Sequence, residues 1–388
     1  MRKLTLKPRE ERRLRNGHLW VFSNEVEGMP ESQPGDLVEV LDHWGRSLGS
    51  AAFHPRSLIC ARLLGGEVRE LDAEFFRARI ARAARLRQEL FPEESCYRLV
   101  NGESDLLPGL IVDRYENRLV VQMLSAAMER GRERIVEVLV ELFQPEAILE
   151  RNELDLRTYE ELPIRKGVLQ GIWRGPVRIR ESGIAYDVDL LEGQKTGFFL
   201  DQKENRAAAA RYCRDREVLD CFCHLGGFGL HAARAGASRV VGVDASSSVV
   251  AAARRNGELN SATVVDFIQS DVFQYLQEAL RDRVGFDVVI LDPPSFAPRK
   301  KDVPKAIRAY RRLNEMALTL LRPEGTLVTA SCSFHLREDV FYRTVSEAAI
   351  RAGRRLQLLE RREQSPDHPV LPGMPETRYL KLGVFRVL

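Results

Sequence analysis

The residues with the clearest chemical potential lie in the run TLVTASCSFHL, residues 326–336, in the last quarter of the chain. A hydrophobic, β-rich run ends there in the small polar triplet Ser331, Cys332 and Ser333, a pattern typical of a strand that passes into a loop. A thiol at that position is either a buried core residue or a nucleophile at the rim of a sheet. The elements that precede Cys332 distinguish these two interpretations.

Aspartates lie at the ends of four strands predicted before Cys332. These are Asp220, Asp244, Asp271 and Asp292. Ligands of parallel α/β sheets bind outside the carboxyl ends of the strands. Asp244 is placed to accept hydrogen bonds from a ribose diol, and Asp271 follows the third strand, where a ribose-bound adenine would reach. One aspartate at a strand end is commonly a solvated residue, but four along one edge indicate a ligand site.

Three glycines follow Asp220 closely: Gly226, Gly227 and Gly229. Glycine allows ligand atoms to approach the backbone and leaves the start of the next helix open. The spacing differs from G-x-G-x-x-G, so the dinucleotide fingerprint is not matched. A nicotinamide dinucleotide site would use Asp244 but has no use for Asp292 and the two prolines after it.

The pattern of strands and helices predicts three domains. Residues 1–70 show short strands separated by turn signals, which indicates a small β-barrel. Residues 71–180 combine helical spacing at 73–90 and 126–143 with strand runs, which indicates an α+β domain. Residues 181–388 alternate strand and helix, which predicts an α/β fold with a mostly parallel sheet and helices on both faces.

Composition limits the class of protein. With 388 residues, 44% hydrophobic and 30% charged, the chain is typical of a globular protein of two or three domains. It lacks an apolar run of about 18 residues and an N-terminal signal peptide, so we expect no membrane association. Six irregularly spaced cysteines indicate reduced thiols and a cytoplasmic location. Basic clusters at 2–15 and 299–312 suit either a phosphate backbone or a solvated surface.

The order of motifs resembles a known family. D-x-x-x-x-x-G-G-x-G from Asp220, then GVD, SD and LDPP, resemble class I S-adenosylmethionine (SAM) dependent methyltransferases, which have a Rossmann-like sheet. The closer resemblance, over nearly the whole chain, is to the RlmI-type large-subunit rRNA cytosine-5 methyltransferases. GHLWVFSNEV with PGDLVEV resembles the family's N-terminal PUA domain, a small RNA-binding barrel, and LLPGLIVDRYENRLVVQ resembles its central domain. EGQKTGFFLDQKENR, LDPPSFA, SCS and DHPV resemble its catalytic domain.

This resemblance implies SAM as the cofactor and no metal. Asp244 would bind the ribose, and Asp271 would lie near the adenine. Asp220 and Asp292 would lie near the methionine end of the cofactor. Further expected contacts are Ala245 and Ser246 after Asp244, the backbone of Cys221, Phe222, Gly226 and Gly227, and a covering segment with Gln194, Lys195, Thr196 and Phe199.

Methylation at carbon 5 of cytosine explains the need for a thiol. Carbon 5 is a poor nucleophile until a thiolate adds to carbon 6. Cys332 is the predicted nucleophile, Asp292 the group that engages the base, and the small flanking serines would leave room for a flipped base. Where another branch of cytosine-5 enzymes has a second cysteine, this chain has Ser295, so the base that removes the carbon-5 proton is not assigned.

The other candidate residues carry weaker signals. Cys221 and Cys223 are expected to fill the core and the cofactor loop, and three cysteines have no supporting context: Cys60, Cys96 and Cys213. The seven histidines lack metal-ligand spacing, and His368 in DHPV is expected in a proline-flanked turn.

The expected partner is 23S rRNA or a precursor of the large ribosomal subunit, and a homodimer is compatible with the sequence. Two alternatives stay open. One is methylation of another RNA atom, such as a guanine ring nitrogen, because Asp292-Pro-Pro-Ser-Phe resembles an amino-methylating loop. The other is a non-catalytic RNA-binding ribosome-assembly factor. The sequence does not give the target nucleotide.

Overall fold

The computed structural model describes all residues 1–388, which group into two compact units. The first unit contains 1–179, 188–200 and 366–377, and the second contains 180–187, 201–365 and 378–388. Two segments predicted with the third domain, 188–200 and 366–377, therefore pack within the first unit. The predicted domain limits at residues 70 and 180 stay a prediction.

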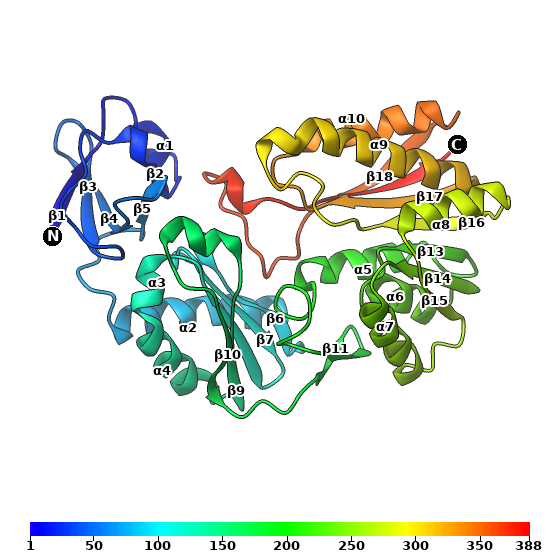
Figure 1. Cartoon of the computed structure of the whole chain (residues 1–388), viewed down its shortest axis with the longest axis horizontal. Helices are drawn as coiled ribbons and strands as arrows, with labels where there is room; N and C mark the ends of the chain where they lie inside the picture. The colour runs from blue at the N-terminus through cyan, green and yellow to red at the C-terminus, as the bar shows by residue number, and fades with distance from the viewer. The chain divides into compact units, whose positions relative to one another are not determined.

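The N-terminal part of the first unit is a five-stranded sheet with the order β1-β3-β4-β5-β2 (Figure 1). Its strands are β1 (Arg2–Thr5), β2 (Trp20–Phe22), β3 (Leu37–Leu41), β4 (Ser47–Phe53) and β5 (Ile59–Leu63), and helix α1 spans Glu11–Arg15. Alternate apolar side chains, such as Val38 and Val40, are fully buried in its core. The β-rich N-terminal domain expected from the turn signals is thus present.

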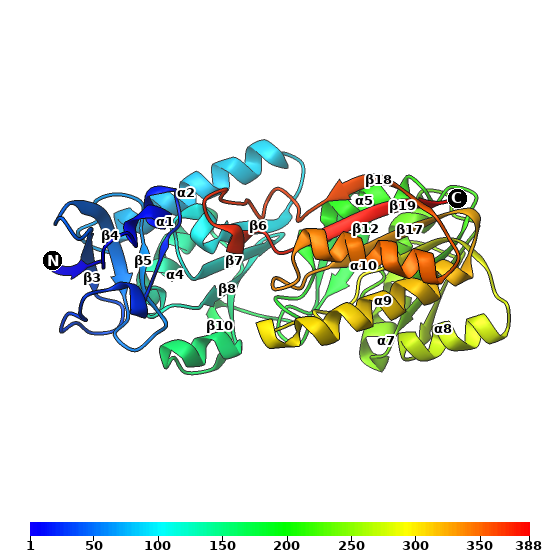
Figure 2. The ribbon, with the colours of Figure 1, turned by 90° about the horizontal axis from the view of Figure 1, so that it is seen from above.

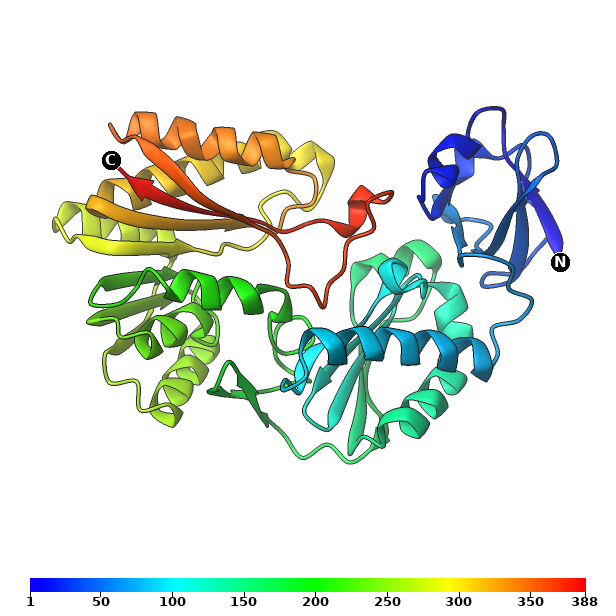
Figure 3. The same ribbon diagram turned by 180° about the vertical axis from the view of Figure 1, so that it is seen from behind.

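A second five-stranded sheet in the first unit has the order β10-β9-β8-β7-β6. Its strands are β6 (Cys96–Asn101), β7 (Leu110–Tyr115), β8 (Arg118–Met123), β9 (Ala147–Asn152) and β10 (Arg165–Gly171). Its helices are α2 (Ala73–Leu90), α3 (Ala126–Arg130) and α4 (Arg132–Phe143). Helix α2 lies along this sheet (Figure 3), and its N-cap Asp72 accepts a hydrogen bond from Phe75 N at 2.8 Å.

The helix expected near 126–143 is divided at Gly131. A Cβ atom on Gly131 would lie 2.6 Å from the ring of Phe76 in α2, so only glycine allows the two helices to approach this closely. The close contact places Ile80 of α2 and Ile135 of α4 in one buried cluster with the sheet. A two-stranded sheet, β11 (Val177–Glu181) with β12 (Ile184–Val188), follows in the chain.

The second unit is built on a seven-stranded sheet with the order β15-β14-β13-β16-β17-β19-β18. The strands are β13 (Glu217–Cys221), β14 (Arg239–Asp244), β15 (Val265–Gln269), β16 (Phe286–Leu291), β17 (Leu321–Ser331), β18 (Leu356–Arg362) and β19 (Lys381–Val387). β13 to β17 are parallel, and β19 runs antiparallel between β17 and β18. The predicted Rossmann-like α/β fold is confirmed.

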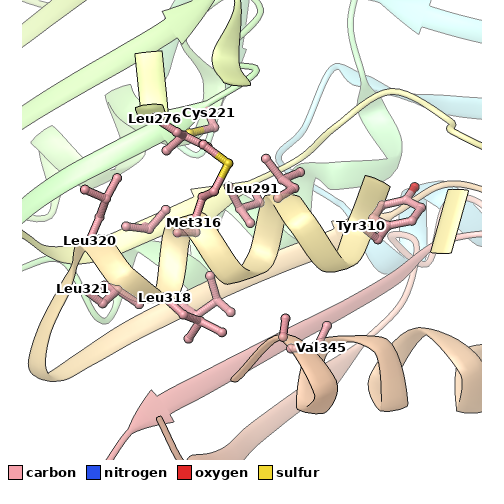
Figure 4. Close-up of a cluster of buried hydrophobic side chains, with 14 of the residues drawn as sticks. Cys221, Leu276, Leu291, Tyr310, Met316, Leu318, Leu320, Leu321 and Val345 are labelled. Carbon is pink, nitrogen blue, oxygen red and sulfur yellow. The ribbon is translucent and has the colours of Figure 1, made fainter. Parts of the chain in front are cut away.

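Helices cover both faces of this sheet (Figures 1 and 2). One face carries α5 (Lys203–Ala210), α6 (Gly227–Arg234) and α7 (Ser247–Leu259), and the other carries α8 (Val272–Arg281), α9 (Val303–Leu320) and α10 (Glu338–Arg351). Leu276 of α8 and Leu318 of α9 are fully buried in one cluster against the strands (Figure 4). Burial of one such leucine contributes about 2 kcal/mol. No helix of the protein combines the length and the apolar composition that crossing a bilayer requires.

Candidate functional site

The parallel register of the second unit brings the predicted strand-end residues to one edge. Four residues form a row across neighbouring strands: Cys221, Val243, Leu291 and Thr329. Asp244 and Asp292 follow this row by one residue, and Cys332 follows it by three. Because the strands are parallel and adjacent, two carboxylates and a thiol from positions 244 to 332 of the chain lie at the same carboxyl edge.

Asp220 lies beneath this edge and is fully buried in β13. Its Oδ2 accepts a hydrogen bond from Gly229 N at 2.8 Å, while Oδ1 has no hydrogen-bond partner. Burial, reinforced by the nearby negative charges of Asp292 and Asp244, raises the pKa of Asp220 to about 8 against the effect of the Gly229 hydrogen bond. A buried acceptor without a partner suits a polar or cationic group of a ligand.

The loop after Asp220 has an unusual backbone. Phe222, His224 and Gly226 all have positive φ, at 63°, 49° and 85°. Two glycines avoid close contacts: a Cβ on Gly227 would lie 2.8 Å from Arg206 Cδ, and one on Gly229 would lie 3.2 Å from Asp220 Oδ2. Packing within the protein thus disfavours a larger residue at Gly227 and leaves little room for one at Gly229, a reason that the sequence did not reveal.

Asp244 joins this loop to the next helix. Its Oδ2 accepts a hydrogen bond from His224 N and its Oδ1 one from Ser246 N, both at 3.1 Å. Ala245 is exposed, and Ser246 Oγ caps α7 by accepting from Val249 N at 3.5 Å. The backbone thus holds the Asp244 carboxylate at the edge, where its remaining lone pairs suit a diol. Ribose binding by Asp244 stays a prediction.

Asp271 is exposed and caps α8, because its Oδ1 accepts a hydrogen bond from Gln274 N at 3.0 Å. The structure thus gives Asp271 a role in helix capping that the sequence analysis did not consider. The predicted proximity to adenine is compatible with this role and remains a prediction.

Asp292 follows β16 and is half-buried. Its Oδ1 accepts a hydrogen bond from Gln202 Nε2 at 2.8 Å, and Gln202 Oε1 in turn accepts from Asn205 Nδ2 at 2.6 Å. Gln202 is buried and was not among the predicted site residues, although it belongs to the motif EGQKTGFFLDQ. Its membership of this motif is the sequence feature that could have identified Gln202 as a site residue.

Cys332 is the first residue after β17 and is half-buried, whereas the other five cysteines are buried. Its Sγ lies 3.9 Å from Pro293 O, in the loop that follows Asp292. The structure therefore places Cys332 against the loop that begins at Asp292, and the roles of both residues on the base stay a prediction. Strong burial raises the pKa of the competing thiols of Cys221 and Cys223 well above its ordinary value, which makes them poor nucleophiles.

Ser333 connects the loops on either side of Cys332. Its Oγ lies 3.1 Å from Ser295 Oγ and 3.1 Å from Tyr310 OH, and it accepts a hydrogen bond from Ala297 N at 3.2 Å. Ser333 is fully buried. Ser333 thus fixes the Cys332 loop to the loop after Asp292, and the room that the flanking serines would leave for a base stays a prediction.

Lys381 is a residue that the sequence analysis missed. It pairs with Ser331 across the β17–β19 ladder and is only 6% exposed. Its Nζ donates hydrogen bonds to Ser333 O at 2.7 Å and to Leu336 O at 3.0 Å. Burial lowers the pKa of Lys381 to about 8. A lone lysine in the apolar run LKLGVF carries no signal that distinguishes it from an exposed one.

The covering segment predicted from EGQKTGFF packs in the first unit. Thr196 is buried, donates a hydrogen bond to Asp113 Oδ2 at 2.6 Å and lies 3.1 Å from Tyr115 OH. Gln194 is exposed, and Lys195 Nζ lies 4.3 Å from the centre of the Phe199 ring. Contact of these side chains with the cofactor stays a prediction.

The DHPV segment also packs in the first unit. Asp367 accepts hydrogen bonds from Arg98 N through its carboxylate and from Arg87 through its carbonyl, both at 2.8 Å. His368 is buried beside Asp367, with 2.9 Å between Nδ1 and Oδ1. These contacts give the segment a structural function in that unit.

Comparisons with known proteins identify the family. Residues 169–386 match the family model described as S-adenosylmethionine-dependent methyltransferase, and residues 4–65 match a PUA-like domain. The chain belongs to the SAM-dependent methyltransferase family. It is 42% identical over 99% of both chains to the Ribosomal RNA large subunit methyltransferase I of Shewanella frigidimarina. It is 40% identical over 96% of both chains to the protein of that name from Vibrio vulnificus.

Solved structures of methyltransferases share the fold. A provisionally assigned SAM-dependent methyltransferase from Streptococcus mutans aligns over 100% of both chains with a TM-score of 0.86 at 21% identity. A tRNA m1G37 methyltransferase from M. jannaschii aligns over 85% of this chain and 82% of its own, with a TM-score of 0.50 at 18% identity. The cofactor of this methyltransferase is SAM. The unpartnered Oδ1 of Asp220 and the carboxylate of Asp244 fit a ligand with an ammonium group and a ribose.

Proposed function

We propose that this methyltransferase methylates carbon 5 of a cytosine in 23S rRNA through a covalent bond between Cys332 and carbon 6 of the base. Cys332 carries the proposal, because it is the one cysteine that is not buried and it lies beside the loop of Asp292. The relatives named as ribosomal RNA large subunit methyltransferases support the substrate class. A cytosine-5 product is what makes a thiol at this place necessary.

The chain's own residues would act on the base in four steps. The thiolate of Cys332 adds to carbon 6, and the π electron pair of the carbon 5–carbon 6 double bond moves onto carbon 5, in conjugation with carbon 4 and N3, which makes carbon 5 nucleophilic. Asp292 would hold the N3 and N4 edge of the base and favour that charge distribution. After carbon 5 has taken up the methyl group, a base removes its proton. The double bond then re-forms, and the Cys332 thiolate leaves.

Residues at the sheet edge would hold the cofactor. When bound, SAM supplies an electrophilic methyl group and leaves as S-adenosylhomocysteine. Asp220 would accept a hydrogen bond at the methionine end, and Asp244 would bind the ribose. Asp271 would contact the adenine, while Gln202 keeps the Asp292 carboxylate oriented.

Binding of RNA would involve the PUA-like domain and the basic segment at 299–312. Lys300, Lys301 and Lys305 are exposed, so they are suited to phosphate contacts. In the N-terminal cluster, by contrast, Arg13 and Arg15 form ion pairs with carboxylates of their own unit. We accordingly propose 23S rRNA or a large-subunit precursor as the partner, in the cytoplasm; the homodimer stays a prediction.

The test is transfer of labelled methyl from SAM to 23S rRNA, with the product base identified after digestion. Cys332→Ala should lower the rate at least about 1,000-fold, because no other group replaces the nucleophile. Cys60→Ala, which removes a buried thiol from the first unit, is the matched control and should keep its activity. Full activity of Cys332→Ala with label in a guanine would favour the ring-nitrogen alternative. Failure to bind SAM in calorimetry would favour a non-catalytic assembly factor.

A further inference from the structure

The second unit contains a buried lysine, Lys381, that has no carboxylate partner. Lys381 lies in β19, the strand between β17 and the edge strand β18 of the seven-stranded sheet, and is 6% exposed. Its Nζ forms hydrogen bonds to the carbonyls of Ser333 and Leu336, and no carboxylate lies within 4.0 Å of it. Buried lysines are rare and normally pair with an acid. A structural lysine at this place would therefore be costly.

The two carbonyls belong to the turn that follows Cys332. Ser333 O accepts hydrogen bonds from Lys381 Nζ at 2.7 Å and from Leu336 N at 3.1 Å. Lys381 also pairs with Ser331 across the strand ladder. Of the two chain neighbours of Cys332, Ser331 is thus the ladder partner of Lys381 and Ser333 accepts a hydrogen bond from its ammonium group.

The other two charged groups that act on Lys381, Glu338 and Arg378, are paired, and Arg378 also forms an ion pair with Glu363 at 2.5 Å. Glu338 at the start of α10 and Arg378 before β19 form an ion pair at 3.3 Å. Tyr310 of α9 faces the loop but stays neutral, because burial raises its pKa to about 12. Cys332 is the remaining group in these surroundings that can carry a negative charge opposite Lys381, and a negative charge there raises the pKa of the lysine.

We propose that Lys381 is the positioning residue and the counter-ion of Cys332: it anchors the turn after the thiol and stabilises the thiolate. The proposal rests on the proposed function in taking Cys332 as the nucleophile. On ionisation, the thiol proton passes to solvent, and Lys381 keeps its own proton. With a pKa of about 8, the lysine is mostly charged at pH 7 and loses this charge as the pH rises above 8.

The experiment measures alkylation of Cys332 by iodoacetamide as a function of pH. Because the other five cysteines are buried, the fast-reacting thiol is Cys332, and Cys332→Ser supplies the blank. In Lys381→Met the pH midpoint should rise by about one unit, so that alkylation at pH 7 slows by about tenfold. Lys381→Arg keeps the positive charge, so its pH midpoint should stay close to that of the unchanged protein. Lys300→Met, a change at an exposed lysine, should leave the midpoint unchanged.

The outcomes separate this proposal from the proposed function. Alkylation needs neither SAM nor RNA, so a shifted midpoint supports the lysine–thiol pair even if Cys332→Ala still methylates RNA. An unchanged midpoint in folded Lys381→Met overturns the pair, even if Cys332 proves to be the nucleophile. Thermal unfolding reports whether each variant is folded. If the methionine variant unfolds, Lys381→Gln, which keeps a donor for the two carbonyls but no charge, decides the question by the same midpoint.

Discussion

Ionisable side chains are buried in two regions of the molecule: around the β6–β10 sheet of the first unit and at the carboxyl edge of the seven-stranded sheet. The two regions differ in whether these side chains have partners of opposite charge. Arg87 of α2 binds Asp105, which follows β6, at 2.7 Å, and Arg98 of β6 binds Asp113 of β7 at 2.6 Å. At the carboxyl edge, Asp220 keeps one oxygen without a partner, and Lys381 has only carbonyl partners.

This contrast separates residues that hold the fold from residues that serve a site. A buried ion pair with satisfied hydrogen bonds is strongly destabilised by the loss of one partner. A buried charge without its opposite is a cost to folding, and such groups are concentrated at functional sites. Substitutions at the two places should therefore affect stability and ligand binding in opposite ways.

The largest expected effect on stability is that of Arg87→Met. The change leaves the Asp105 carboxylate buried without its partner and removes the hydrogen bond to Asp367 O, so the free energy of unfolding should fall by about 3–5 kcal/mol. Arg85→Met, at an exposed position of the same helix, should change it by less than about 0.5 kcal/mol. Urea titration measures both. Equal effects of the two substitutions would show that the buried Arg87–Asp105 pair contributes no more to stability than an exposed arginine does.

Asp220→Asn, in contrast, should raise the free energy of unfolding and weaken the binding of SAM. Because burial raises the pKa of Asp220 to about 8, the folded chain binds a proton more tightly than the unfolded chain does. This carboxyl group therefore lowers stability as the pH rises from about 4 to about 8. The asparagine variant should lose that pH dependence and gain on the order of 1 kcal/mol for each pH unit above about 4. Its Kd for SAM should rise at least about tenfold.

Urea titrations between pH 5 and pH 8 measure the first of these effects, and calorimetry with SAM the second. A stability loss at pH 7 with unchanged SAM affinity would place Asp220 among the structural residues.

The smallest expected effect is that of Asp271→Ala. Loss of the α8 cap should lower the free energy of unfolding by about 1 kcal/mol. If Asp271 also contacts the adenine, the Kd for SAM should rise about threefold to tenfold, and this is the result we expect. Thermal unfolding and calorimetry provide the two numbers. A changed stability with an unchanged Kd would leave Asp271 a helix cap alone.

Part of the site could be predicted because it depends on local patterns. The strands that end at Cys221, Asp244 and Leu291 are short, largely apolar runs, and each is followed within a few residues by turn or helix-start signals. Parallel strands necessarily present their carboxyl ends together, so the sequence placed Asp244, Asp292 and Cys332 at one edge. The helix break at Gly131 depends on a tertiary contact with Phe76 that such patterns do not encode, whereas Asp271 directly before α8 is itself a local capping signal.

The sequence by itself determined the order of strands and helices, the α/β class of the second unit and the family, because periodicity and motif spacing are local properties of the chain. The tertiary structure alone decided which distant residues meet. It inserts β19 antiparallel beside β17 and thereby brings Lys381 to Cys332, 49 positions earlier in the chain. It also packs the segments around Thr196 and Asp367 in the first unit. Pairing across a sheet is a non-local choice, and a lone lysine in an apolar run does not reveal it.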